Sequence, residues 1–190
     1  MKARIFILGL VMAIISVNTF AQEFKANVDA TSIKWTGTKV VGSSHYGYVK
    51  LKEGNLSLTK GNIQDGKFVI DMSSMTNTDI ENEDYNKKLI GHLHSDDFFS
   101  VTQFPTATLE ILKAEKFKGD KASVNGQLTI KGQTKPIEFT VEKKENSYIA
   151  SIAVDRTIYG IRYGSGSFFD NLGDKAIDNE FTMDVKLIVE

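Results

Sequence analysis

The sequence predicts an all-β domain of about eight antiparallel strands that can close into a barrel. Apolar and polar residues alternate along most of the chain, which is typical of strands with one buried and one solvated face. Short turn signals separate these segments, so consecutive strands are expected to form a meander. The chain has no cysteine, so packing alone must stabilise it, which favours a sizeable sheet or barrel. A two-sheet sandwich is the alternative that this pattern leaves open.

The alternation is clearest in the last segment, where the odd positions from 181 to 189 are apolar and positions 182, 184 and 186 are polar. Such a pattern places the apolar side chains on one face of a strand. The predicted strands lie at residues 33–36, 46–58, 67–72, 109–111, 124–130, 137–141, 148–154 and 181–189.

Glycine and asparagine mark the predicted turns between these strands. The prolines, Pro105 and Pro136, lie near strand starts, where proline is tolerated. The predicted turns are Lys60-Gly61-Asn62, Asp65-Gly66, Lys118-Gly119-Asp120, Lys131-Gly132-Gln133 and Glu145-Asn146-Ser147.

Two long segments interrupt the alternation. Within residues 73–104, Tyr85, Leu89 and Leu93 recur at helical spacing, which predicts a short helix between the third and fourth strands. Residues 157–176 interleave glycines with aromatic residues and are expected to form a long loop. Loops of this length in a compact domain are often functional.

The first 21 residues resemble a secretory signal peptide. Lys2 and Arg4 precede an apolar run, and Thr19-Phe20-Ala21 places small residues where cleavage before Gln22 requires them. The run from residue 5 to residue 17 is too short for a membrane-spanning helix, which needs about 20 residues. We therefore expect a signal peptide at residues 1–21 and one barrel domain at residues 22–190, with no stable membrane insertion.

Charge and composition exclude several classes of partner. The net charge is −1, and loss of Lys2 and Arg4 with the signal peptide takes it to −3. No run of basic residues occurs, which argues against nucleic acid and anionic membrane surfaces as partners.

The stretch "HLHSDDFF", residues 92–99, could indicate a metal site, a catalytic acid cluster or a packed helix end. An H-x-H pair shares a face on a strand, but on the predicted helix its side chains point about 200° apart. Asp96 and Asp97 are adjacent and would not converge on one bond as a glycosidase pair must. With no nucleophile elbow, P-loop or dinucleotide fingerprint, the sequence predicts no enzyme, no cofactor and no metal site.

Four segments resemble the signatures of the YceI-like family. "HLHSDDFFSVTQFPTATLE" is similar to its helix end, Phe-Phe turn and Pro-led strand, and "VNGQLTIKGQTKPIEF" to its Gly-x-Leu-Thr-Ile hairpin. "DRTIYGIRYG" and "GSSHYGYV" resemble two further elements of the family in the expected order. The resemblance implies an eight-stranded, lipocalin-like barrel exported to the periplasm, which binds a polyisoprenoid such as a polyprenyl phosphate or a quinone tail. It also implies that residues 92–99 close one mouth of the barrel, with Phe98 and Phe99 as buried plugs.

Strand parity predicts which side chains face such a lumen, because a closed barrel in water keeps its charged side chains outside. The predicted lipid-binding residues are Ile33, Trp35, Phe68, Ile70, Leu109, Ile111, Phe139, Val141, Met183 and Val185.

The matched motifs contain His45 and Arg156, which are the candidates for binding a polar head group, since arginine suits phosphate geometry. An ion pair between Arg156 and a carboxylate such as Asp155 is the alternative. Two other functions stay open at this stage: an enzyme acting on an apolar substrate, and a stress-response partner protein without a lipid. A homodimer is also left open.

Overall fold

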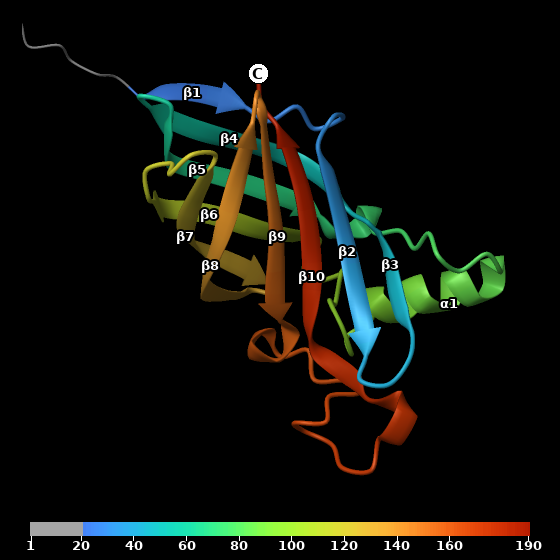
Figure 1. Cartoon of the computed structure of the whole chain (residues 1–190). Helices are drawn as coiled ribbons and strands as arrows, with labels where there is room; N and C mark the ends of the chain where they lie inside the picture. The colour runs from blue at the N-terminus through green and yellow to red at the C-terminus, as the bar shows by residue number, and fades with distance from the viewer. Residues whose placement is uncertain (1–20) are drawn as a thin grey trace, which may run out of the picture.

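The computed structural model describes residues 21–190 as one curled antiparallel sheet with a single α-helix beside it (Figure 1). Nearly all of the predicted signal peptide, residues 1–20, lies outside the described residues. The strands are β1 (Gln22–Lys25), β2 (Ser32–Lys39), β3 (Ser44–Tyr48), β4 (Lys50–Thr59), β5 (Asn62–Asp71), β6 (Thr106–Ala114), β7 (Lys121–Ile130), β8 (Gln133–Lys144), β9 (Ser147–Asp155) and β10 (Ile177–Ile188). The helix α1 spans Glu83–His94, and three 3-10 helices lie at η1 (Met72–Ser74), η2 (Arg156–Tyr159) and η3 (Gly173–Lys175).

The strands hydrogen-bond in the order β1-β4-β5-β6-β7-β8-β9-β10-β2-β3. β3, at one end of this order, continues through Val49 into β4, the strand next to the other end, and the Val49 N–H donates to the Ile33 carbonyl on β2 at 3.0 Å. A bridge between Ala26 and Val189 also ties the end of β1 to the end of β10. The result is a single half-barrel, so the two-sheet sandwich is excluded.

The predicted count of eight strands is wrong, because the sheet has ten. Residues 46–58 form two strands, since β3 pairs with β2 while β4 pairs with β5 and β1. The alternation of apolar and polar residues keeps the same phase from β3 into β4, so it could not show that the chain changes its pairing partner there. With β1 also added, the helix lies between the fifth and sixth strands and not between the third and fourth.

The turn predictions are confirmed at most positions. Lys60 and Gly61, like Lys131 and Gly132, have positive φ angles of 51°, 76°, 52° and 71°, as the tight hairpin turns of type I′ require. Asp65-Gly66 is not a turn, because it lies inside β5 where the register with β4 shifts by one residue.

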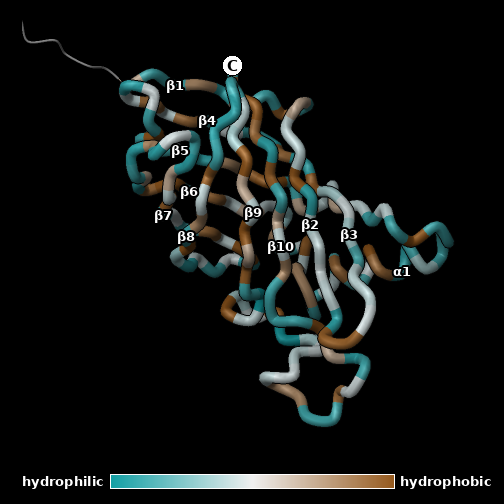
Figure 2. The backbone as a smooth tube through the Cα atoms, in the orientation of Figure 1, coloured by the Kyte–Doolittle hydropathy of each residue, from teal (hydrophilic) through white to brown (hydrophobic). Residues whose placement is uncertain are grey.

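Hydropathy alternates along the long strands (Figure 2), and the inward side chains form two apolar clusters. One cluster lies toward β1 and the C-terminus and contains Leu56 and Val124. The other lies toward α1 and contains Phe98 and Ile161. Within residues 21–190, no helix is long and apolar enough to cross a membrane.

Residues 75–80 cover β3, the last strand of the sheet. The N–H groups of Thr76 and Thr78 donate to the carbonyls of Tyr48 and Tyr46 at 2.8 and 3.0 Å. The Trp35 indole N–H donates to the Thr76 carbonyl at 2.9 Å. This covering segment occupies an edge that would otherwise be open to pairing with another chain.

Gly47 makes this close approach possible, and we predict that Gly47→Ala destabilises the protein by about 2 kcal/mol through overpacking. A Cβ atom at position 47 would lie 1.8 Å from the Thr76 carbonyl oxygen, which is backbone and cannot rotate away. Gly37→Ala on the neighbouring strand is the control, since nothing lies within 4 Å of a Cβ there. Urea denaturation measures both variants, and equal midpoints would show that the covering segment moves aside at no cost.

Candidate functional site

The sheet encloses an apolar cavity in two lobes that lie end to end. The β1-side lobe is bounded by Leu56, Ile63 and Leu187, and the α1-side lobe by Leu93, Phe98 and Phe99. The centre of a water-sized sphere can move through about 120 Å³ of the first lobe and about 130 Å³ of the second. A single water needs roughly 10–15 Å³ by this measure, so both lobes can hold a larger apolar group.

Four side chains line both lobes and form a waist between them: Ile70, Leu128, Val154 and Met183. Ile70 and Met183 are only half-buried although they pack against both apolar clusters. Their exposure therefore faces the hollow interior and not bulk water. Met183 is unbranched and flexible, so a rotamer change there can widen the waist.

All ten residues that parity places in the lumen line this cavity. Trp35 lies in the α1-side lobe, Ile70 and Met183 at the waist, and the other seven in the β1-side lobe. Contact of these residues with a lipid stays a prediction. The cavity also has walls that parity alone did not single out, chiefly Leu51, Val124, Leu128, Ile152 and Val154 on neighbouring strands.

The surfaces of both lobes are almost entirely apolar. Arg156, Asp178 and Glu180 are among the residues that line the α1-side lobe, and Thr31 and Tyr148 among those that line the other, but their polar atoms are scarcely exposed to the cavity. Burial raises the pKa of the Tyr148 hydroxyl. Both lobes therefore suit an apolar ligand, and Arg156 is the one cationic side chain among the residues within 21–190 that line them.

Arg156 is buried and serves as a staple between η2 and β10. Its Nε–H donates to the Asp178 carbonyl at 2.8 Å, and one Nη2–H donates to the Ile177 carbonyl at 3.0 Å. Its Nη1 donates to the carbonyls of Ile161 and Tyr163, both at 2.9 Å. Burial lowers the pKa of this guanidinium, although the nearby carboxylates of Asp155 and Asp178 act to raise it.

Four of the five guanidinium donors are thus used by backbone carbonyls. The expected alternative, an ion pair with Asp155, is replaced by another arrangement, in which Asp155 accepts from the Thr157 N–H at 2.8 Å and caps η2. Binding of a head group by Arg156 stays a prediction, with one N–H left to make it.

We predict that Arg156→Lys lowers the free energy of unfolding by about 3 kcal/mol or more, because one ammonium cannot reach all four buried carbonyls. Arg162→Lys is the matched control, since Arg162 is exposed and its guanidinium lies over the Phe168 ring. Chemical denaturation of both variants measures the difference. If both substitutions lower the free energy of unfolding by the same amount, the hydrogen bonds from Arg156 to the four backbone carbonyls contribute nothing to stability.

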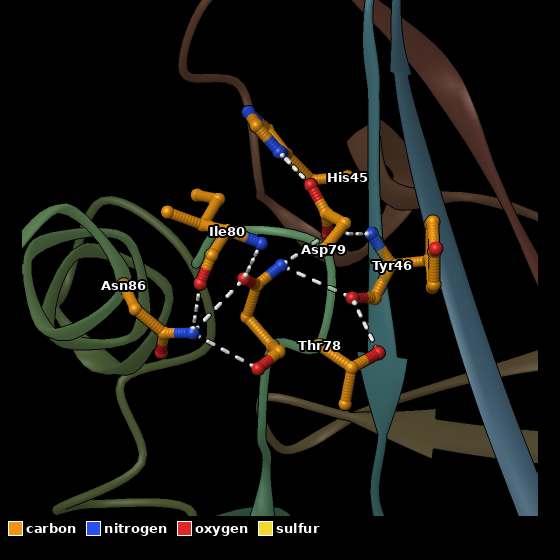
Figure 3. Close-up of polar contacts among 7 residues, drawn as sticks. His45, Tyr46, Thr78, Asp79, Ile80 and Asn86 are labelled. Atoms are coloured by element: carbon orange, nitrogen blue, oxygen red, sulfur yellow. Dashed lines mark hydrogen bonds and ion pairs between the residues drawn. The ribbon is translucent and has the colours of Figure 1, made fainter. Parts of the chain in front are cut away.

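His45, the other head-group candidate, lies outside the set of cavity-lining residues. Its Nδ1 is 2.7 Å from a carboxylate oxygen of Asp79, and its side chain is 37% exposed. Asp79 also accepts from the Tyr46 N–H at 2.7 Å and from the Asn77 amide, as Figure 3 shows. The Asn86 amide joins this network from α1 by donating to the carbonyls of Asn77 and Ile80 at 3.0 and 3.1 Å. His45 therefore belongs to a polar latch that fastens residues 77–86 to β3.

Asp79 gives this latch a pH dependence. Burial acts to raise its pKa, but the hydrogen bonds from the Tyr46 N–H, His45 and Asn77 outweigh that effect and hold the pKa below its ordinary value.

We predict that the stability difference between wild type and Asp79→Asn shrinks as the pH falls below about 4. The folded pKa of Asp79 is depressed, so its contribution is present above the unfolded value and is lost as the pH falls through the folded value. Urea denaturation at about pH 6 and about pH 2.5 tests this. A difference that is the same at both pH values would contradict it.

The stretch "HLHSDDFF" forms the end of α1 and the turn after it, as predicted. Phe98 is buried, Phe99 is half-buried, and both line the α1-side lobe. The His92 ring packs at right angles against Phe98 and Tyr163, with centroid distances of 4.9 and 4.5 Å. Burial lowers the pKa of His94. Within residues 21–190, no three His, Cys, Asp or Glu side chains are grouped as a metal site would need.

The fold and the cavity define a class of curled β-sheet proteins with an apolar interior. The chain belongs to the YceI-like family, whose domain model matches residues 24–189. A UPF0312 protein of Vibrio campbellii is 30% identical over 153 residues, which are 75% of this chain and 74% of that protein. Protein YceI of Shigella flexneri is 31% identical over 99 residues, which are 52% of this chain and 48% of that protein.

Solved structures share the fold at low sequence identity. Burkholderia cenocepacia BcnA has a TM-score of 0.62 at 17% identity, with 87% of this chain and 99% of that chain covered. A structure described as a polyisoprenoid binding domain from Saccharophagus degradans has a TM-score of 0.56 at 14% identity, with 88% and 97% covered.

Proposed function

We propose that the protein binds a long isoprenoid-type lipid, such as a polyprenyl phosphate or a quinone tail, in the two-lobed cavity. The observation that carries the proposal is the apolar cavity itself, which passes through a waist where Ile70 and Met183 stay half-buried and face a hollow instead of a filled core. The description of the Saccharophagus degradans domain as polyisoprenoid binding supports the ligand class.

The energetics suit a chain-like ligand. Burying one methylene contributes about 0.8 kcal/mol, so a tail of about 20 carbons offers roughly 16 kcal/mol before costs. Association and ordering cost several kcal/mol or more, which leaves a usable affinity. Apolar filling would supply the affinity, and Arg156 beside the α1-side lobe would select the head group.

The proposed compartment is the periplasm, reached after cleavage before Gln22, and the proposed role is transport, storage or sequestration of the lipid. The signal-like pattern of residues 1–21 supports export. Protein purified from a periplasmic fraction should begin at Gln22, and a chain that retains residues 5–17 in the membrane pellet would contradict this.

We predict that Leu109→Trp reduces the lipid recovered with the purified protein by about tenfold, because an indole would fill the β1-side lobe. Leu112→Trp is the matched control on the same strand, since Leu112 is 58% exposed and lies outside both lobes. Native mass spectrometry followed by solvent extraction measures the lipid, and circular dichroism checks folding. A folded Leu109→Trp protein with a full complement of lipid would place the lipid elsewhere.

Trp35 provides a second measurement that needs no substitution. It is the single tryptophan of the chain and lines the α1-side lobe. A bromine-labelled prenyl lipid bound there should quench its fluorescence, whereas an unlabelled lipid should not. Absence of quenching at saturating lipid would exclude the α1-side lobe from the binding site.

A further inference from the structure

Exposed apolar side chains gather at one end of the half-barrel. Of the eleven large hydrophobic residues exposed within residues 21–190, six lie in the β2–β3 turn or between β9 and β10. The most prominent are Val40 and Val41, each 59% exposed, with Phe168 and Phe169 at 45% and 50%. We refer to these four residues as the apolar rim.

The two segments of the rim are fastened to each other. The Val40 N–H of the β2–β3 turn donates to the Ala176 carbonyl at 2.9 Å. Within the connection from β9 to β10, the Ile177 N–H donates to the Gly164 carbonyl at 2.7 Å. Figure 1 shows the β2–β3 turn and the loop before β10 together at the end opposite to β1 and the C-terminus.

The turn that presents the two phenylalanines is anchored. The N–H groups of Phe168 and Phe169 donate to the Ser165 carbonyl at 3.1 and 3.0 Å. Ser165 is fully buried, and its hydroxyl donates to the Asn179 side chain at 2.6 Å. A fixed turn therefore holds two adjacent phenyl groups in water, an arrangement that marks an interaction site.

The opposite end of the half-barrel is more polar. Its β4–β5, β6–β7 and β8–β9 turns meet around a shallow hollow lined by Lys60, Gly61, Asn62, Phe117, Gly119, Asp120, Lys143 and Glu145. The exposed apolar side chains are thus concentrated at the end that contains the α1-side lobe.

The rim is continuous with the cavity. Ile177, next to the Ala176 carbonyl that holds Val40, lines the α1-side lobe, and so does Gly37 on β2. An occupant of the rim would therefore lie beside the α1-side lobe. A lipid surface is the partner that would both cover the rim and exchange a lipid with this lobe.

The charges around the rim suit the head-group region of a bilayer, but not a strongly anionic surface. The Arg162 guanidinium lies 4.5 Å from the Phe168 ring centroid, and Lys39 and Lys175 flank the loops, but Asp170 and Asp174 offset them. Basic side chains beside aromatic rings are common at the level of lipid head groups. With charges nearly balanced, apolar insertion would have to supply the affinity.

We propose that the apolar rim inserts into the surface of a phospholipid bilayer and holds the α1-side lobe against it while lipid passes between bilayer and cavity. The proposal rests on the proposed function for the identity of the cargo. The docking itself is a separate property of the four rim residues.

The test is co-sedimentation of the mature chain with uncharged vesicles of phosphatidylethanolamine and phosphatidylcholine. The variant V40S/V41S/F168S/F169S should bind at least about tenfold more weakly, since each buried phenyl group contributes about that factor or more. Leu112→Ser is the matched control on an exposed residue of β6 and should bind like wild type. Binding of wild type should persist in about 0.5 M salt, because screening weakens only the charged contacts.

Each outcome tests membrane docking by the apolar rim separately from lipid binding in the cavity. Equal vesicle binding by wild type and the rim variant would overturn the proposal, as would no binding by wild type. A wild-type dimer that the rim substitutions convert to monomers, without vesicle binding, would assign the rim to a second copy of this chain and also overturn it. Mass spectrometry of bound lipid tests the proposed function independently, and the rim variant should keep its lipid.

Discussion

The register of β10 between β2 and β9 is the constraint on which the cavity depends. Met183 pairs with Trp35 on one side and with Ile152 on the other, and Val185 pairs with Ile33 and Ala150. A slip of β10 by one residue would turn Met183 and Val185 outward and bring Asp184 and Lys186 into the lumen. The many backbone hydrogen bonds between β10 and β9 make such a slip costly. The apolar cavity, and the lipid affinity proposed for it, therefore depend on backbone pairing as much as on which side chains are present.

Alternation predicted the strands and the inward residues well because the face of a strand is a local property of the chain. It failed where the structure depends on a distant partner. Positions 49 and 51 continue the inward phase of position 47, so nothing local shows that the chain leaves β2 and joins β5 at Val49. β1 was missed because Phe24 is its only apolar residue. Asp65-Gly66 has turn chemistry, but its glycine instead lets β5 approach Asn55 and Leu56 closely.

The motifs that carry the family resemblance have structural tasks. In "DRTIYGIRYG", Asp155 caps η2, Arg156 binds four carbonyls, and Gly160 ends η2 with a positive φ of 78°. In "GSSHYGYV", Gly47 admits the covering segment, and His45 fastens the latch. Sequence reasoning assigned His45 and Arg156 to a head group because the matched motifs contain them and arginine suits phosphate geometry. The motifs do not show that their partners in the fold are the Asp79 carboxylate and four backbone carbonyls. The motifs therefore identify the fold, whereas the side chains that line the cavity would determine which ligand binds.

A hollow interior also links stability to cargo. The half-buried side chains at the waist lack packing partners when the cavity is empty, so part of the dispersion energy of an ordinary core is not gained. A ligand that fills both lobes supplies those contacts and binds only the folded chain, which raises the free energy of unfolding in proportion to the logarithm of its concentration over its Kd. The empty form has to rely on the polar devices at the α1 side, namely the Arg156 staple and the Asp79 latch. Both sets of hydrogen bonds lie around the α1-side lobe, beside the apolar rim. The end of the molecule through which we propose that lipid is exchanged is therefore stabilised by hydrogen bonds that do not depend on bound lipid.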